Sequence, residues 1–455
     1  MRRERVPYGP AELEVEVPDQ TRVVDATVPI GLPPAPDPAS DLRQALASPL
    51  GLPPLSTLVR RGSRVFLAFD DPCSATRQPV RHLLLQEVVG HLLEAGVRLG
   101  DITFHCANAL HRRWRREELA ATIGPDLVER FGDRLRCHDA EEPGGFLYLG
   151  TTPNGYEVEV RREVAENDLT VYVNRGSTGF SGGWKSVIIG LGTWRSIRAT
   201  HHPDGMSMSV RHNRFHQVLN EMGEHLERRL GKRIFKVETL LADQSHIARV
   251  WAGGVAETRQ AALEVLQALV PPRRGQVAPA DVVLYGVPDW SPYATLAGLN
   301  PILTLVSTGL GYLGGYIEAV GKPGCSVILA TPCPEEWDME HHPSYKVAWD
   351  QVLPQTRDAY EVHRRFAEEF AGRQDLIERY RFGYAYHPVH AILAIHPLKR
   401  LRHAGRVFVA GAMDPAVPRH LGFIPVPTVE EALAEAHRIH GPDPSIVLVR
   451  TGRPY

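Results

Sequence analysis

Short apolar runs alternate with a longer stretch of helical period in the first half of the chain. Residues 64–69 and 102–107 are apolar enough for buried strands, and residues 80–96 between them carry leucine and valine at helical spacing. Residues 168–174 add a further strand. Two parallel strands need a crossover connection, which the helix between the first two runs supplies. The pattern therefore predicts an α/β fold with a mainly parallel sheet flanked by helices.

A comparable pattern returns in the second half. Helical period predicts helices at residues 214–230 and 256–269, and a proline-rich linker follows at 271–275. Beyond the linker we expect a second α/β unit with short strands and one late helix. The strands are predicted at residues 281–287, 326–330, 392–395, 407–410 and 445–450, and the helix at 429–439.

The length of 455 residues exceeds what one hydrophobic core usually serves, so two domains are expected. The first would span residues 1–270 and bind a cofactor, and the tail 435–455 is a candidate to complete its sheet. The second would span residues 275–434. We expect cofactor and substrate in the cleft between the two domains.

Composition excludes some classes of partner. A formal net charge of -2 gives no general attraction to nucleic acid or to an anionic membrane. No apolar stretch has the length of a membrane span, and the first residues lack the apolar core of a signal peptide, so a cytoplasmic protein is expected. The 5 cysteines are scattered and form no CxxC pair, which favours reduced, buried thiols.

A glycine-rich segment, Gly-Phe-Ser-Gly-Gly-Trp-Lys at residues 179–185, is the first candidate for chemistry. Small residues let backbone amides approach a ligand closely, and this segment ends at Lys185. An amine can become a covalent nucleophile when it loses its proton, whereas a guanidinium cannot. A lysine that only contacts phosphate in a glycine-rich turn is the competing interpretation. His201 follows and could ligate a metal as a neutral imidazole.

Several motifs, in their order along the chain, resemble the nickel-dependent lactate racemase family, whose members bind a nickel-pincer nucleotide. The motifs are Asp70-Asp71, Thr76-Arg77-Gln78-Pro79, His111-Arg112, Cys137-His138-Asp139, residues 179–185, Thr200-His201 and Gly422-Phe423. The resemblance implies that Lys185 is joined covalently to the cofactor and that His201 ligates nickel.

The same resemblance assigns further roles. His111 would be the proton acid/base, and Arg77 would hold the substrate carboxylate through two parallel hydrogen bonds. The family reaction moves a hydride from a 2-hydroxy acid to the cofactor and back. It implies a small 2-hydroxy acid as substrate and cofactor-synthesis proteins as partners. Further residues would contact the cofactor: Asp71, Thr76, Ser181, Gly182 and Gly183. Without the resemblance, a capping or bridging role for His111 in an arginine-rich surface turn is favoured over a catalytic one.

Arg175 marks a departure from the family pattern. The family's lactate enzymes carry a second histidine upstream of the modified lysine, and this chain has Arg175 at that position. Arginine is a poor base, so two-base lactate racemisation is not expected. Arg175 is instead a candidate to bind a second anionic group of a different substrate. Residues 289–296 also lack the lysine that lactate enzymes place in the second domain.

Three functions remain open from the sequence. The first is a racemase or epimerase of a 2-hydroxy acid other than lactate, using the nickel-pincer nucleotide. The second is a one-base, oxidoreductase-like enzyme on the same cofactor. The third is a non-catalytic cofactor carrier or binding protein. His111 and Arg77 argue against the third, because a carrier needs neither an acid/base nor a substrate clamp.

Overall fold

Two compact units make up the chain in the computed structural model, which describes residues 1–26, 31–73, 78–207, 209–269 and 278–451. The N-terminal unit consists of residues 31–269 with Glu378–Tyr384. The C-terminal unit consists of residues 278–377 and 385–451, joined by residues 1–26. Each unit is built around its own 6-stranded sheet, in which parallel pairs predominate. The predicted α/β class is confirmed.

The sheet of the N-terminal unit has the strand order β11-β10-β9-β4-β5-β6. Its strands are parallel except for the antiparallel pair β10 and β11. Their bounds are β4 Val65–Asp70, β5 Ile102–Ala107, β6 Leu135–Cys137, β9 Leu169–Val173, β10 Phe235–Leu241 and β11 Ile247–Gly254. A separate hairpin is formed by β7 (Phe146–Thr151) and β8 (Glu157–Arg161).

The helices have the following bounds. They are α1 Pro38–Ala47, α2 Leu55–Leu58, α3 Gln78–Glu94, α4 Arg116–Ile123, α5 Pro125–Phe131, α6 Arg162–Glu166, α7 Lys185–Ile188, α8 Trp194–Ile197, α9 Arg214–Leu230, α10 Val255–Leu269, α11 Ile317–Val320, α12 Pro343–Val347, α13 Ala359–Ala371, α14 Gln374–Phe382, α15 His390–Ile395, α16 Ala416–His420 and α17 Val429–His440. A π-helical segment, η4, spans Ile302–Leu313.

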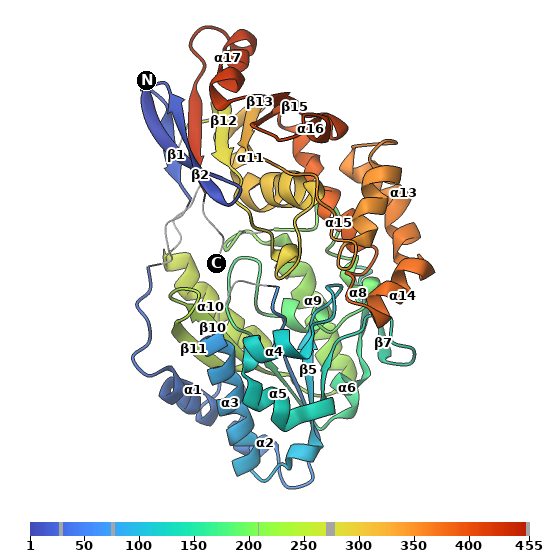
Figure 1. Cartoon of the computed structure of the whole chain (residues 1–455). Coiled ribbons are helices and arrows are strands. Elements are labelled where there is room, and N and C mark those ends of the chain that lie inside the picture. Colours follow the sequence, from blue (N-terminus) through green and yellow to red (C-terminus); the bar gives the residue numbers. More distant parts are fainter. Residues whose placement is uncertain (27–30, 74–77, 208, 270–277, 452–455) are drawn as a thin grey trace. The chain divides into compact units, whose positions relative to one another are not determined.

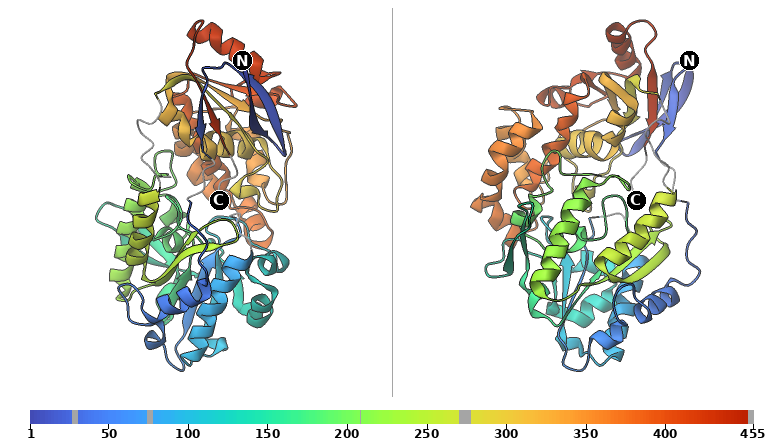
Figure 2. Two further views of the ribbon diagram at one scale, coloured as in Figure 1. Left: turned by 90° about the vertical axis from the view of Figure 1, so that its left-hand side faces the viewer. Right: turned by 180° about the vertical axis from the view of Figure 1, so that it is seen from behind.

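Strand β4 lies at the centre of the N-terminal unit because its run is apolar on both faces. Val65, Leu67 and Phe69 on one face and Phe66 and Ala68 on the other are no more than 1% exposed, as expected for a strand covered by helices on both sides. Helix α3 connects β4 to β5, and α9 connects β9 to β10 in the opposite direction along the sheet. Right-handed crossovers then place α3 and α9 on opposite faces, as Figures 1 and 2 show.

Helix α9 confirms the predicted bounds 214–230 and packs closely on the glycine-rich segment. The side chain of Asn213 caps its first turn by accepting from the amide of His216 at 3.0 Å. In its middle, Gly223 faces the indole of Trp184, and a Cβ atom at Gly223 would lie 2.0 Å from Cδ2 of that ring. The contact ties α9 to the residue that precedes Lys185.

Replacing Gly223 by alanine is expected to lower the free energy of unfolding by about 1–3 kcal/mol, because overpacking outweighs the gain in helix propensity. Gly90 of α3 is the matched control, since a Cβ there would meet no atom within 4 Å. Gly90→Ala should raise the free energy of unfolding by about 0.4–1 kcal/mol. Denaturant unfolding measures both, and equal effects would contradict the packing of Trp184 on α9.

The sheet of the C-terminal unit has the order β15-β14-β13-β12-β16-β3, and each of its neighbouring pairs is parallel. Its strands are β3 Arg22–Asp25, β12 Ala280–Gly286, β13 Gly321–Ala330, β14 Arg406–Ala410, β15 Ile424–Val426 and β16 Ile446–Arg450. The idea that the tail 435–455 completes the first domain's sheet is wrong, because β16 lies between β12 and β3. The predicted linker 271–275 lies outside the described residues.

The strand predicted at residues 392–395 is wrong, because this run belongs to helix α15. Ile392, Ala394 and Ile395 are all buried, so the short run carries no polar position that could reveal a helical period. The predicted strands 281–287, 326–330, 407–410 and 445–450 are confirmed within a few residues as β12, β13, β14 and β16, and the helix 429–439 as α17.

The first residues of the chain belong to the C-terminal unit, not to the first domain as expected. β1 (Arg2–Tyr8) and β2 (Ala11–Val17) form an antiparallel hairpin, drawn in blue in Figure 1, whose β1 contacts β12. No helix of the described residues is long and apolar enough to cross a membrane. All five cysteines are free thiols; Cys106, Cys325 and Cys333 are buried as expected, whereas Cys73 and Cys137 are half-buried.

Candidate active site

The reversal of strand order at β4 places three loops together in the N-terminal unit. Strand β4 has β5 on one side and β9 on the other, so the chain leaves it in both directions along the sheet. In open parallel sheets, ligands bind outside the carboxyl ends of strands at such a switch point. The loops that start there carry Asp71 after β4, His111 after β5 and Arg175 after β9.

Asp71 and His111 form a hydrogen-bonded pair across two of these loops. Nδ1 of His111 lies 2.8 Å from Oδ2 of Asp71, and the two side chains are only 19% and 7% exposed. Burial alone would raise the pKa of Asp71, but the charge and the hydrogen bond of His111 hold it below its usual value. The carboxylate therefore accepts the Nδ1 proton, which leaves Nε2 of His111 as the basic nitrogen.

The turn that carries His111 is fixed by its own backbone. The side-chain amide of Asn108 donates to the carbonyls of His111 and His138, each at 3.0 Å, and the amide of His111 donates back to the carbonyl of Asn108 at 2.7 Å. Ala109 has φ of 51°, a left-handed conformation that alanine rarely adopts. Such strain persists only where the surroundings impose it, and it is concentrated at functional sites.

Asp70 has a different role from its neighbour Asp71. Its carboxylate accepts from the hydroxyl of Tyr172 at 2.9 Å and from the backbone amide of Arg175 at 3.0 Å. It therefore joins the end of β4 to the start of the loop after β9. The Arg81 side chain of α3 donates to the backbone carbonyl of Asp71 at 2.8 Å and secures the other side of the same loop.

Arg175 lies half-buried at this sheet edge. Burial and the nearby guanidinium of Arg81 lower the pKa of Arg175 to about 10. The guanidinium therefore stays protonated near neutral pH and can serve as an anion partner but not as a base. The loops at this end of the sheet therefore carry an imidazole, His111, and a guanidinium that stays charged, Arg175.

A cluster of buried charged side chains, which we call the loop clamp, binds the backbone of the glycine-rich segment. It consists of Lys236 and Glu238 on β10 and Arg259 on α10, which are 0%, 0% and 5% exposed. Glu238 accepts from the amide of Gly183 at 3.2 Å, and Lys236 donates to the carbonyl of Gly183 at 3.0 Å. Arg259 donates to the carbonyl of Ser181 at 2.7 Å.

The glycines of this segment are required by the loop clamp. Gly182 has φ of 100°, and a Cβ atom there would lie 2.0 Å from Oε1 of Glu238. Gly183 has φ of 55°, and its amide points to Glu238. The amide of Ser181 donates to the hydroxyl of Thr178 at 2.8 Å. The small residues therefore let the backbone approach the buried charges. The amides of Ser181 and Gly183 already donate hydrogen bonds within the protein.

Lys185 begins α7 directly after this segment, beside a stack of two aromatic rings. Its Nζ lies 4.6 Å from the ring centre of Phe180, which stacks on Phe215 of α9 at 5.1 Å. His201 contacts Phe215 from another side at 6.2 Å. Nδ1 of His201 lies 3.0 Å from the Thr200 hydroxyl and 3.2 Å from the Ile197 carbonyl. These partners orient the ring.

His201 is electrically neutral at physiological pH. Burial first, and then the positive charge of Lys185, lower the pKa of His201 to about 3, and the charge of His111 acts in the same direction. The influence of these two residues also shows that the three side chains share one region of the N-terminal unit. A neutral imidazole with its Nδ1 held by a backbone carbonyl has the usual arrangement of a metal ligand.

Comparison with known proteins identifies relatives of this unit. Residues 8–213 match the family model of the lactate racemase N-terminal domain. The lactate racemase of Thermoanaerobacterium thermosaccharolyticum is 25% identical over 206 residues, which are 43% of this chain and 46% of the relative. That of Lactiplantibacillus plantarum is 22% identical over 238 residues, 50% of this chain and 54% of the relative. The chain is a divergent relative of the lactate racemases.

Solved structures extend the likeness beyond the matched sequence. The lactate racemase apoprotein from Thermoanaerobacterium thermosaccharolyticum has a TM-score of 0.68 at 19% identity, with 98% of both chains covered. A protein from Thermotoga maritima has a TM-score of 0.56 at 16% identity, with 92% of this chain and 97% of that chain covered. At these identities the structural likeness shows the fold. By sequence, the chain spans about half the length of the curated lactate racemases it matches.

The structure brings together most of the residues selected by the resemblance to the lactate racemase family. Asp71, His111 and Arg175 follow neighbouring strands, and Lys185 and His201 lie on either side of one aromatic stack. Two of the predicted residues, Thr76 and Arg77, lie outside the described residues. The roles assigned to these side chains stay predictions.

The sequence interpretation missed the loop clamp, although a signal was available. Residues 235–241 read Phe-Lys-Val-Glu-Thr-Leu-Leu, so Lys236 and Glu238 share one face of an otherwise apolar strand. Charged side chains in such a strand are almost never fully buried without a partner. The pairing with a glycine-rich segment far away in sequence could not be read from this pattern.

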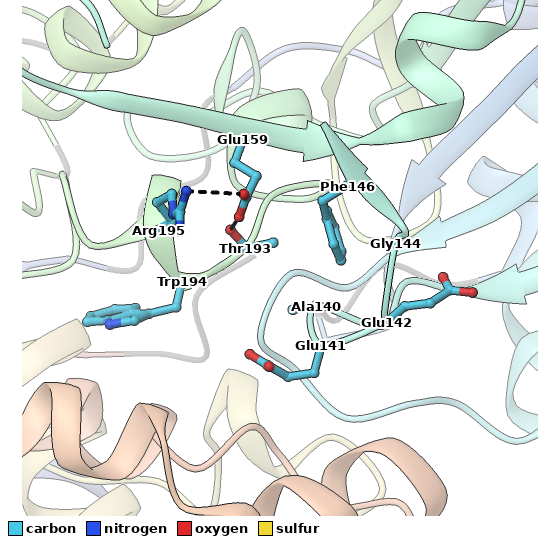
Figure 3. A pocket seen from close by; sticks show the side chains of 9 residues that line it. All are labelled: Ala140, Glu141, Glu142, Gly144, Phe146, Glu159, Thr193, Trp194 and Arg195. Carbon is cyan, nitrogen blue, oxygen red and sulfur yellow. Dashed lines mark hydrogen bonds and ion pairs between the residues drawn. The ribbon is translucent and has the colours of Figure 1, made fainter. Parts of the chain in front are cut away.

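A cavity of about 400 Å³ lies elsewhere in the N-terminal unit, near β8 and α8 (Figure 3). Its lining includes Glu159, Thr193 and Arg195, and none of the predicted site residues is among the lining residues. Glu159 accepts from the Thr193 hydroxyl at 2.5 Å and lies 3.6 Å from the Arg195 guanidinium. The polar groups of this wall therefore satisfy one another.

Replacing Glu238 by glutamine is expected to lower the free energy of unfolding by about 3–5 kcal/mol, because it leaves Lys236 and Arg259 as buried charges without their compensating carboxylate. Glu257 is the matched control, because it forms an ion pair with Arg233 in which the Glu257 side chain is 37% exposed and the Arg233 side chain 40%. Glu257→Gln should cost no more than about 1 kcal/mol. Urea unfolding of both variants gives the comparison. A small loss at Glu238 would show that the clamp contributes little.

Proposed function

We propose that the chain is a nickel-pincer nucleotide-dependent racemase or epimerase of a 2-hydroxy acid other than lactate. The observation that carries this proposal is the buried Asp71–His111 pair at the switch point of the sheet. The charge of Lys185 acts on the pKa values of both Cys73 and His201, and the charge of His111 also acts on that of His201. The relatives named lactate racemase support the reaction class.

The residues present fit the proposed cofactor. His201 is half-buried and neutral, and the partners of its Nδ1 leave Nε2 available to a metal. Lys185 is half-buried and offers a primary amine at the end of a rigidly held segment. In that position Lys185 would hold the nucleotide and His201 the nickel. When bound, the cofactor supplies a hydride acceptor and donor.

The protein's own contribution to the reaction is proton transfer and orientation. Nε2 of His111 would take the proton of the substrate hydroxyl and later return it. Asp71 fixes the tautomer of His111 by accepting its Nδ1 proton, and its negative charge stabilises the imidazolium that forms. The strained turn at Ala109 holds the imidazole in place while the proton moves.

Arg175 supports a substrate other than lactate. Its guanidinium stays protonated, so it would bind an anionic or carbonyl oxygen of the substrate through its fork of N–H donors. Lactate has one carboxylate, for which Arg77 is the candidate partner. A substrate with a second acidic group would use both arginines. Cofactor-synthesis proteins are the expected partners of the chain.

Cofactor loading is the direct test of this proposal. After co-expression with cofactor-synthesis proteins, the intact mass is expected to show a covalent adduct, and elemental analysis about one nickel per chain. Lys185→Arg should abolish the adduct, because a guanidinium cannot replace the amine. Lys232→Arg is the matched control, since Lys232 binds the backbone carbonyls of Ala165 and Asn167 away from the segment. Absence of both adduct and nickel from the wild-type chain would overturn the proposal.

Turnover tests the acid/base assignment. The loaded enzyme, given single-enantiomer 2-hydroxy acids in deuterated water, should invert one of them while its carbinol proton is retained. His111→Ala should lower kcat by about 10²–10⁴-fold with unchanged nickel content. His82→Ala should leave kcat unchanged, because the His82–Asp126 pair has the same 2.8 Å distance but joins α3 to α5 with side chains that are 29% and 51% exposed. Equal activity of His111→Ala and wild type would contradict the assignment.

A further inference from the structure

Cys73 joins Asp71 and His111 in a compact group of three different ligand types. Nδ1 or Nε2 of the histidine, Sγ of the cysteine and a carboxylate oxygen of the aspartate all lie within 4.8 Å of one another. We propose that these three side chains bind a divalent ion of the zinc class in the protein that lacks the nucleotide. This site does not include His201, so it is distinct from the nickel position in the proposed function.

The donor set suits zinc better than magnesium or calcium. Thiolate and imidazole are the ligands that zinc and its neighbours prefer, and a carboxylate completes many such sites. Three protein ligands with a fourth position for water are the usual composition of an open zinc site. Asp71, Cys73 and His111 follow the adjacent strands β4 and β5, whose parallel pairing fixes the spacing of their backbones.

Charge balance also favours an ion at this position. The Asp71 carboxylate and a Cys73 thiolate together neutralise one divalent cation, so the occupied site carries no net charge. In the metal-free protein, burial raises the pKa of the Cys73 thiol well above its usual value, while the charges of Lys185 and Arg175 act against that increase. Metal binding would release the thiol proton to solvent as the metal–sulfur bond forms.

Backbone anchors hold two of the ligands in advance. The Arg81 guanidinium donates to the carbonyl of Asp71 at 2.8 Å, and the Asn108 amide donates to the carbonyl of His111 at 3.0 Å. Because the ligands are already close together, binding would replace the Asp71–His111 hydrogen bond by metal bonds to both residues and add a third bond to Cys73. If Nδ1 of His111 binds the ion, its proton moves to Nε2, and the Cys73 thiol proton is released to solvent. The ion would occupy His111 and should therefore compete with its proposed role as a base.

Zinc binding to the cofactor-free protein tests the site. Protein expressed without cofactor-synthesis proteins, stripped with a chelator and titrated with zinc sulfate, should bind about one equivalent. Cys73→Ser should weaken the affinity by at least about 100-fold, since a hydroxyl replaces the thiolate. Cys137→Ser is the matched control in the same unit and should leave the affinity unchanged. His201→Ala should also leave it unchanged, which separates this site from the nickel proposal.

Cobalt(II) provides a spectroscopic check on the same variants. A thiolate-to-cobalt charge-transfer band is expected for the wild type and for Cys137→Ser, and should be absent for Cys73→Ser. Circular dichroism and thermal melting establish whether each variant is folded. If Cys73→Ser does not fold, His111→Ala replaces it in the zinc titration and in the cobalt spectrum. No stoichiometric zinc in the wild type would overturn the proposal, as would unchanged affinity in folded Cys73→Ser or His111→Ala. Failure of nickel loading would not affect it.

Discussion

The contact between one buried carboxylate and a glycine-rich segment is the constraint on which the candidate site depends. Glu238 lies fully buried on β10 and accepts from the amide of Gly183, between the cations Lys236 and Arg259. Removing a charge from such a group leaves the others without compensation, so the arrangement tolerates little change. It fixes the backbone from which Lys185 projects. A lysine on a freely moving glycine-rich loop could not be held in one position relative to His201.

Sheet topology supplies the second half of the site. The switch point at β4 gathers the ends of three strands, and each end contributes a different function: a carboxylate, an imidazole and a guanidinium. Asp70 links the first and third of these loops through Tyr172 and the Arg175 amide. The loop that carries Asp71 is thereby joined to the loop that leads into the lysine segment, although the two lie far apart in the sequence.

Asp71 and His111 are suited to two uses that exclude each other. As a hydrogen-bonded pair they form an oriented base, and with Cys73 they form a set of metal ligands. The same closeness produces both properties, because a carboxylate that orients an imidazole also lies within reach of an ion bound to it. In the proposed zinc site Cys73 would decide between them, because metal binding requires its thiolate.

The sequence by itself determined the α/β class, the strands and helices with clear period, and the family resemblance with its candidate residues. It selected His111, Lys185 and His201 as candidates, because the motifs that contain them are short and local. It could not show that Asp71 pairs with His111, that Gly182 packs on Glu238, or that β16 joins β12. These contacts connect residues far apart in the chain, and periodicity carries no information about which distant segments meet. The strand predicted at residues 392–395 was wrong for a related reason. These residues are apolar because the tertiary structure buries them, so the sequence pattern does not distinguish a helix from a strand.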